Sequence, residues 1–126
     1  LPAVIRLVPR DPLRMDPAPL SRLYLDLGKR GAEAVICRAL DDLTRRLNRI
    51  DDAHRGCDFA AIGLETRRVR VIAEQIGLTE VAEVAAHVID CSADGNGMAL
   101  GATLARLIRV TDRCVTEIWA LRGVGS

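Results

Sequence analysis

The chain has few aromatic residues. They make up 2% of its 126 residues, and the full set is Tyr24, Phe59 and Trp119. A surface that stacks the bases of single-stranded nucleic acid needs several such rings. The formal net charge of +1 also gives no general attraction to a polyanion. We therefore expect no nucleic-acid partner.

Long apolar runs are missing as well. No run approaches the roughly 20 residues that a membrane-spanning helix requires. The first residues, LPAVIRLVPRDP, do not fit a signal peptide, because prolines and charges interrupt them. These absences predict a cytoplasmic protein with no membrane partner.

Motifs for metal binding and catalysis are not evident. The four cysteines are far apart and none belongs to a C-x-x-C pair, which argues against a structural zinc site. Two disulfides are one alternative, but free thiols on apolar helical stripes are favoured for Cys37, Cys91 and Cys114. The chain also has no glycine-rich phosphate loop and no paired-carboxylate motif. We expect no metal, no cofactor and no enzymatic activity.

All five prolines lie within the first 19 residues, and none occurs after residue 19. This change in composition predicts an N-terminal arm over residues 1–19 and a helical domain over residues 20–126. The apolar residues within 4–8 are compatible with a short extended segment in the arm.

Apolar residues recur at helical spacing from Leu20 onward. Residues 20–27 suit a short helix that ends at Gly28 or Gly31. A long helix follows and frays near Arg55 and Gly56. Steps of four and three residues place one apolar stripe along this helix, formed by Ile36, Leu40, Leu43, Leu47 and Ile50.

Three further helices are expected over residues 58–76, 79–91 and 98–121. Asp58 is a suitable N-cap for the first of them, and Gly77 is a suitable stop. The intervening loop SADGNG is rich in turn-forming residues. Long helices joined by short loops favour antiparallel neighbours. The predicted fold class is all-α, an antiparallel up-down four-helix bundle with a short N-terminal helix and an extended arm.

The segment RRVRVIAEQIGL, residues 67–78, resembles the central helix of a histidine-containing phosphotransfer (HPt) domain. Domains of this family carry H-x-x-K-G on that helix and a glycine ten residues after the histidine. Counting back ten residues from Gly77 places Arg67 at the histidine position. Arg70 then stands at the lysine position and Val71 at the glycine position.

The resemblance covers residues 20–121, where the order and lengths of the expected helices also follow the family. It implies a signalling module of a two-component phosphorelay, whose partner is a response-regulator receiver domain or a histidine kinase. A guanidinium stays protonated and is a poor nucleophile, so Arg67 is not expected to accept phosphate. The implied function is docking without phosphotransfer.

The candidate partner-binding surface lies on the same helix. Gly63, Arg67, Arg70 and Glu74 recur at steps of four, three and four residues, opposite much of the apolar stripe. Together with Val71 they form a surface on which two arginines can hold carboxylates through forked hydrogen bonds. The alternative is an ordinary solvated helix face, on which Arg70 pairs with Glu74.

Two histidines leave phosphotransfer open as an alternative function. His87 shares the polar side of its helix with Glu80, Glu83 and Asp90, which favour the charged imidazole and oppose its phosphorylation. His54 stands near the end of the long helix, where it suits an interaction with that C-terminus. A third hypothesis is a structural helical module for scaffolding or for self-association as a homodimer.

Overall fold

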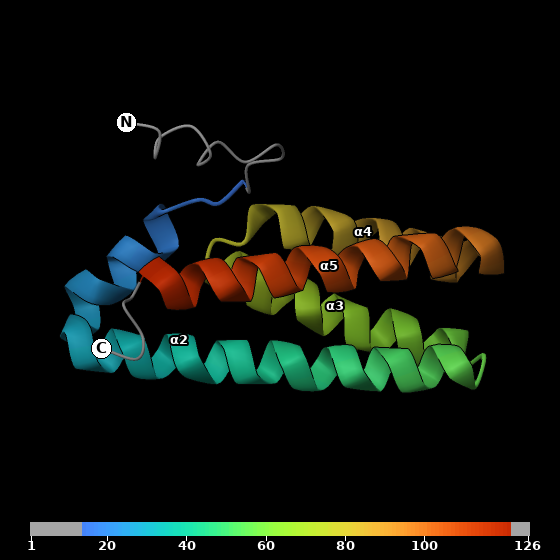
Figure 1. Cartoon of the computed structure of the whole chain (residues 1–126), viewed down its shortest axis with the longest axis horizontal. Helices are drawn as coiled ribbons and strands as arrows, with labels where there is room; N and C mark the ends of the chain where they lie inside the picture. The colour runs from blue at the N-terminus through green and yellow to red at the C-terminus, as the bar shows by residue number, and fades with distance from the viewer. Residues whose placement is uncertain (1–13, 122–126) are drawn as a thin grey trace, which may run out of the picture.

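The computed structural model describes residues 14–121 and contains four helices (Figure 1). They are α2 (Ala18–Arg55), α3 (Phe59–Gln75), α4 (Thr79–Asp94) and α5 (Gly97–Leu121). No strand occurs within this part of the chain. The predicted all-α class is therefore confirmed, whereas the short extended segment expected in the arm falls outside the described residues.

Helix α2 is broken at Gly28, one of the two glycines at which the sequence predicted a break. The backbone there has φ +74° and ψ 175°, a combination that is essentially restricted to glycine. Residues 18–27 form a short leading segment that meets the long body of α2 at a sharp angle (Figure 1). The predicted stripe of the long body is buried in full: Ile36, Leu40, Leu43, Leu47 and Ile50.

Local chemistry sets most of the helix ends. The Asp58 carboxylate accepts a hydrogen bond from the Ala61 N–H at 3.1 Å, which caps the start of α3. Helix α4 continues to Asp94 and ends at Gly95, whose φ of +69° is left-handed. Its connection to α5 is therefore shorter than the expected loop over residues 92–97.

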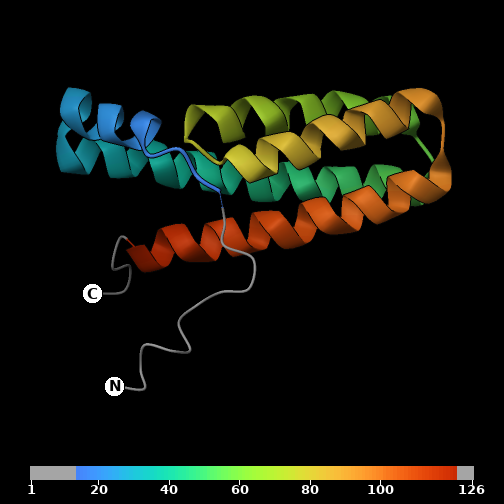
Figure 2. The ribbon, with the colours of Figure 1, turned by 90° about the horizontal axis from the view of Figure 1, so that it is seen from above.

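Each helix lies beside the next one in the chain, and the chain direction reverses from helix to helix (Figures 1 and 2). Helix α3 lies between α2 and α4, and α4 also contacts α5. Helices α2 and α5 approach each other closely at only a few positions. The core thus forms along the inner faces of all four helices.

Helix α5 supplies one side of this core. One face of this helix is buried along its length: Leu100, Leu104, Leu107, Thr111, Cys114 and Ile118. Burying one leucine or isoleucine side chain stabilises a fold by roughly 1.5–3 kcal/mol. Packing of such stripes, more than the helix propensity of any single segment, therefore holds the four helices together.

Residues 14–16 form what we call the arm clasp, which fastens the start of the described chain to the turn between α3 and α4. The Asp16 N–H donates to the Gly77 carbonyl at 2.8 Å, and the Glu80 N–H donates to the Arg14 carbonyl at 3.3 Å. The Arg14 guanidinium also lies 2.6 Å from the Glu83 carboxylate. The turn and the clasp therefore form one unit.

Candidate functional site

Arg67 occupies the centre of the candidate surface. It lies midway along α3 and its side chain is exposed. Its neighbour Arg68 is exposed as well. Neither guanidinium forms an ion pair with any residue in the described part of the chain. These two positive charges are thus available to an external carboxylate.

Arg70 differs from Arg67, because it already has a partner. Its Nε lies 3.4 Å from Oε2 of Glu74, one helical turn further along α3. The two side chains are 48% and 55% exposed, so solvent screens the pair and its net contribution is about 0–1 kcal/mol. The sequence analysis gave this ion pair as the alternative to a role of Arg70 in partner binding. The two arginines therefore do not act alike.

Gly63 is buried and does not share the exposed surface with the other predicted residues. A Cβ at this position would lie 3.1 Å from Oγ of Ser92, which is tighter than ordinary packing. Ser92 belongs to α4, so the role of Gly63 is to let α3 and α4 approach closely. Helical spacing alone placed this residue on the wrong side of α3.

Two apolar side chains flank the free arginines. Leu64 and Val71 are each 52% exposed. They are seven residues apart, which places them two turns apart on one side of α3. We refer to Leu64, Arg67, Arg68 and Val71 as the α3 docking face. The sequence analysis named Val71 but missed Leu64 and Arg68. Leu64 could have been found, because it is an apolar residue that lies outside the predicted apolar stripe of this helix.

The docking face borders an open groove between α2 and α3 with a volume of about 470 Å³. Besides the docking face itself, Asp42, Arg46, Ile72 and Gln75 line this groove. Ile72 is half-buried and packs against the core. The groove therefore combines an apolar base with two arginines that have no partner.

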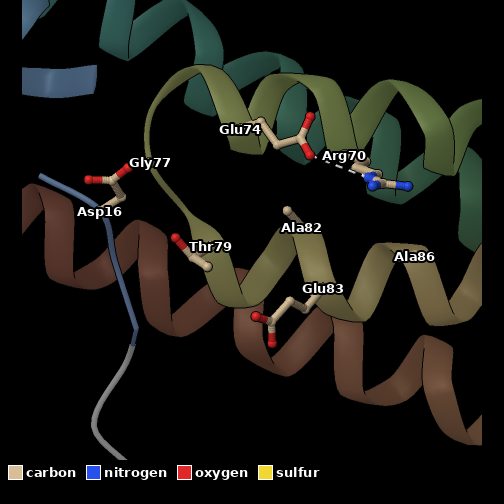
Figure 3. Close-up of a pocket in the computed structure, with 8 residues that line it drawn as sticks. All are labelled: Asp16, Arg70, Glu74, Gly77, Thr79, Ala82, Glu83 and Ala86. Atoms are coloured by element: carbon tan, nitrogen blue, oxygen red, sulfur yellow. Dashed lines mark hydrogen bonds and ion pairs between the residues drawn. The ribbon is translucent and has the colours of Figure 1, made fainter. Parts of the chain in front are cut away.

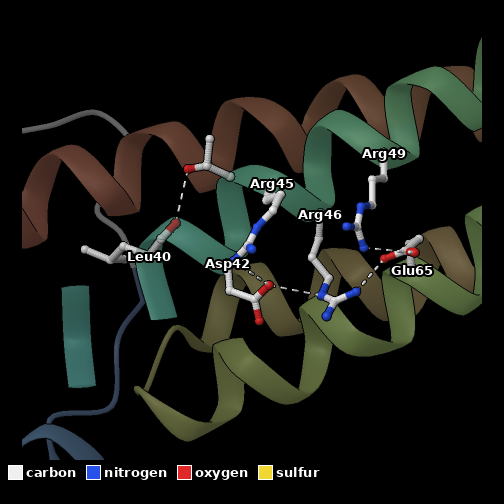
Figure 4. Close-up of polar contacts among 7 residues, drawn as sticks. Leu40, Asp42, Arg45, Arg46, Arg49 and Glu65 are labelled. Atoms are coloured by element: carbon white, nitrogen blue, oxygen red, sulfur yellow. Dashed lines mark hydrogen bonds and ion pairs between the residues drawn. The ribbon is translucent and has the colours of Figure 1, made fainter. Parts of the chain in front are cut away.

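Arg46 forms a fixed part of that groove (Figure 4). Its Nη1 donates to Oε1 of Glu65 at 2.9 Å, and its Nε lies 3.3 Å from Oδ1 of Asp42. The hydrogen bond with Glu65 is the largest cause of the raised pKa of Arg46. Because the Arg46 and Glu65 side chains are mostly buried, this contact links α2 to α3 and holds the groove in shape.

A second groove, of about 390 Å³, lies on the other side of α3, against α4 (Figure 3). Arg70 lines it together with three carboxylate side chains, those of Asp16, Glu74 and Glu83. The hydrogen bond from Arg14 is the largest cause of the lowered pKa of Glu83. Because the lining contains three carboxylates and one guanidinium, this groove is acidic on balance, in contrast to the one on the α2 side.

Neither histidine belongs to the docking face. His87 is exposed on α4, where Glu83 and Asp90 are also exposed. His54 is half-buried in the last turn of α2. Its Nε2 lies 3.9 Å from the place that a Cβ on Gly101 would take, so the imidazole faces the start of α5.

Comparison of the chain with protein-family models, with curated proteins and with solved structures returned no match. Within residues 14–121, no group of three or more His, Cys, Asp or Glu side chains is placed to hold a metal ion. None of the helices in that range has both the length and the apolar character needed to cross a bilayer. The docking face and the groove beside it combine exposed arginines with exposed apolar side chains.

Proposed function

We propose that the chain is an HPt-like signalling module that binds a receiver domain or a histidine kinase without accepting phosphate. The observation that carries this proposal is the exposed Arg67 midway along α3, ten residues before Gly77. The reversal of chain direction between successive helices supports the finer part of the proposal, an up-down four-helix bundle of the HPt type.

The chemistry of Arg67 favours docking over phosphotransfer. A neutral imidazole is a nucleophile, whereas a guanidinium remains protonated and offers only hydrogen-bond donors. Receiver domains present a pocket of clustered aspartates to the phosphate carrier of an HPt domain. Carboxylates of such a partner can pair with Arg67 and Arg68 through charge-assisted, forked hydrogen bonds.

The apolar part of the docking face supports the same function. Leu64 and Val71 remain about half exposed, whereas Ile62, Val69 and Ala73 of the same helix are buried. A protein partner can cover such side chains and gain from removing them from water. A helix face that only contacts solvent gains nothing from exposed apolar side chains such as Leu64 and Val71.

The test separates binding from chemistry. The chain is incubated with a panel of phosphorylated receiver domains and histidine kinases, and binding and label transfer are measured independently. We expect at least one panel member to bind and no acid-labile phosphate to appear on the chain. Failure of every member to bind contradicts the docking role.

A gain-of-function variant sharpens this test. The triple substitution Arg67→His, Arg70→Lys and Val71→Gly rebuilds H-x-x-K-G on α3. We expect it to acquire label from a bound receiver domain, because it places an imidazole at the contact. The matched control, Arg109→His on an exposed position of α5, is expected to remain unlabelled.

Two other outcomes favour the alternatives. Acid-labile phosphate on the unmodified chain would show active phosphotransfer, and loss of the label in His87→Gln or His54→Gln would identify the carrier. A stable dimer in light scattering that depends on Leu64 and Val71 would instead favour self-association, because both side chains are exposed in the single chain.

A further inference from the structure

We infer that the partner places an amphipathic, acidic helix over the groove between α2 and α3, and leaves the groove between α3 and α4 unused. In this arrangement the carboxylates of the partner pair with Arg67 and Arg68. Its apolar side chains cover Leu64 and Val71. This inference rests on the proposed function and specifies where the partner binds and what its surface carries.

Charge separates the two sides of α3. On the α2 side, Arg67 and Arg68 have no partner within the described residues, so an external carboxylate meets a free cation. On the α4 side, three carboxylates (Asp16, Glu74 and Glu83) outnumber one guanidinium (Arg70) in the lining of the groove, so the lining is negative on balance although Glu74 and Glu83 each pair with an arginine. An acidic surface placed there would face like charges, which oppose association.

The spacing of the apolar side chains fits a helix as occupant. Leu64 and Val71 are separated by about 10 Å along the axis of α3, since each residue adds 1.5 Å. A helix that lies in a groove between two others contacts them through side chains at helical spacing. Ile72 provides an apolar base for it beside the arginines.

The groove between α2 and α3 is also preorganised. Arg46 is held by Glu65 and Asp42 at 2.9 and 3.3 Å, so the charges of the groove wall are already paired. A partner therefore does not have to order this wall when it binds. On the α4 side, by contrast, the arm clasp places Asp16 against Gly77 at the edge of the groove.

The same residues argue against a phosphate backbone as the occupant. A nucleic acid binds to a continuous strip of lysine and arginine side chains. Here Asp42 and Glu65 stand among the arginines of α2 and α3. Leu64 and Val71 would remain exposed to water beneath such a ligand. The acidic helix of a protein satisfies both the charged and the apolar parts.

A selection experiment tests the chemistry of the occupant without any prior partner. A display library of helical peptides, each about 18 residues or five turns long, is selected on the full chain. We expect the enriched peptides to carry an apolar stripe flanked by Asp or Glu. Enrichment of neutral or basic peptides, or of none, overturns the inference.

Substitutions in the chain then test the place of binding. The double charge reversal Arg67→Glu with Arg68→Glu is expected to weaken the selected peptides by at least about tenfold. Two controls are expected to leave their affinity within about twofold. One is the double reversal Arg106→Glu with Arg109→Glu on α5, and the other is Ala86→Trp, which fills the acidic groove.

The outcomes separate this inference from the proposed function. If acidic helices bind in a manner that requires Arg67 and Arg68 but no receiver domain or kinase binds, only the proposed function fails. If a receiver domain binds and the double reversal leaves that binding unchanged, the inference fails together with the role that the proposed function gives to Arg67 and Arg68, whereas receiver binding itself stands. Loss of binding in Ala86→Trp alone moves the contact to the α4 side and overturns the inference.

Discussion

At the scale of single residues, Cys114 shows how burial changes chemistry. Its side chain is fully buried on α5, and burial is the main cause that raises the pKa of its thiol from 9.0 to about 11. The thiol therefore stays protonated at neutral pH and is a poor nucleophile. Cys57, in the turn between α2 and α3, is the exposed one of the four cysteines.

The shift at Cys114 predicts a pH dependence of stability. The folded pKa lies above the unfolded value, so the folded state binds the extra proton and the contribution is complete below pH 9.0. It is lost as the pH rises to about 11, by at most roughly 3 kcal/mol. Denaturant unfolding of the wild type and of Cys114→Ala, across this interval, measures the difference. A difference that does not vary with pH contradicts the prediction.

The sequence predicted the exposure of Arg67 but not the burial of Gly63. Arg67 is opposite the apolar stripe in any reasonable orientation of α3, so periodicity was sufficient. Gly63 lies at the edge of the stripe, where burial depends on how closely α4 approaches. The sequence also could not show that Arg70 forms an ion pair whereas Arg67 does not. The spacing on α3 fitted both an ion-paired and an unpaired arginine at these positions.

At the scale of elements, the turn between α3 and α4 depends on Gly77 for two reasons. Its φ of +80° is left-handed, a region that other residues rarely adopt. In addition, a Cβ on Gly77 would overlap the carbonyl oxygen of Asp16 in the arm clasp. Gly95, after α4, has a similar φ of +69° but open space around its Cβ position.

This pair of glycines gives a matched comparison. We expect Gly95→Ala to lower the free energy of unfolding by about 1–2 kcal/mol, the cost of a left-handed residue with a side chain. Gly77→Ala should lower it further and release the arm clasp. Denaturant unfolding measures the first effect, and hydrogen exchange of the Asp16 and Glu80 amides reports the second. Equal losses in the two variants, with both amides still protected, would exclude the steric contribution.

Helix ends were predictable where a local signal sets them, as at Asp58 and Gly77. The arm clasp was not, because its contacts join residues as far as 66 and 69 positions apart. Helix α4 extends beyond the expected end at residue 91. Gly95 terminates it in a left-handed conformation. The sequence could not identify this residue, because several glycines and polar residues of that loop are equally suited to end a helix.

At the scale of the whole molecule, the helices are not equally enclosed. Helix α3 contacts α2 on one side and α4 on the other, whereas α5 is packed closely against α4 and approaches α2 at few positions. The boundary between α2 and α5 is therefore the place where the core is held by the fewest close contacts. Regions of low contact density open at lower free energy than the rest of a fold.

Native-state hydrogen exchange can measure this difference. We expect the buried amides of α3, such as that of Val69, to exchange only through global unfolding. The amides of α5, such as that of Leu107, should exchange through a smaller opening with a lower free energy. Equal exchange free energies for the two helices, together with equal denaturant dependence, would show that the four helices unfold as one unit.

The order of the helices within residues 14–121 could be predicted from the sequence, because apolar periodicity is a local property. How closely each pair packs could not, since that depends on side chains from separate helices. The same limit applies to the docking face. The sequence contains Leu64 and Arg68, but only the path of α2 beside α3 places them along a groove.

Gly28 decides where the first described residues can reach. With a larger residue there, the bent backbone becomes unfavourable and an uninterrupted α-helix is preferred. The 38 residues of α2 would then form a straight rod of about 57 Å. Residues 14–16 would be carried to its far tip, well away from Gly77. A single methyl group at this bend thus shifts the balance from the folded-back chain toward the straight helix, and the contacts of the arm clasp oppose that shift.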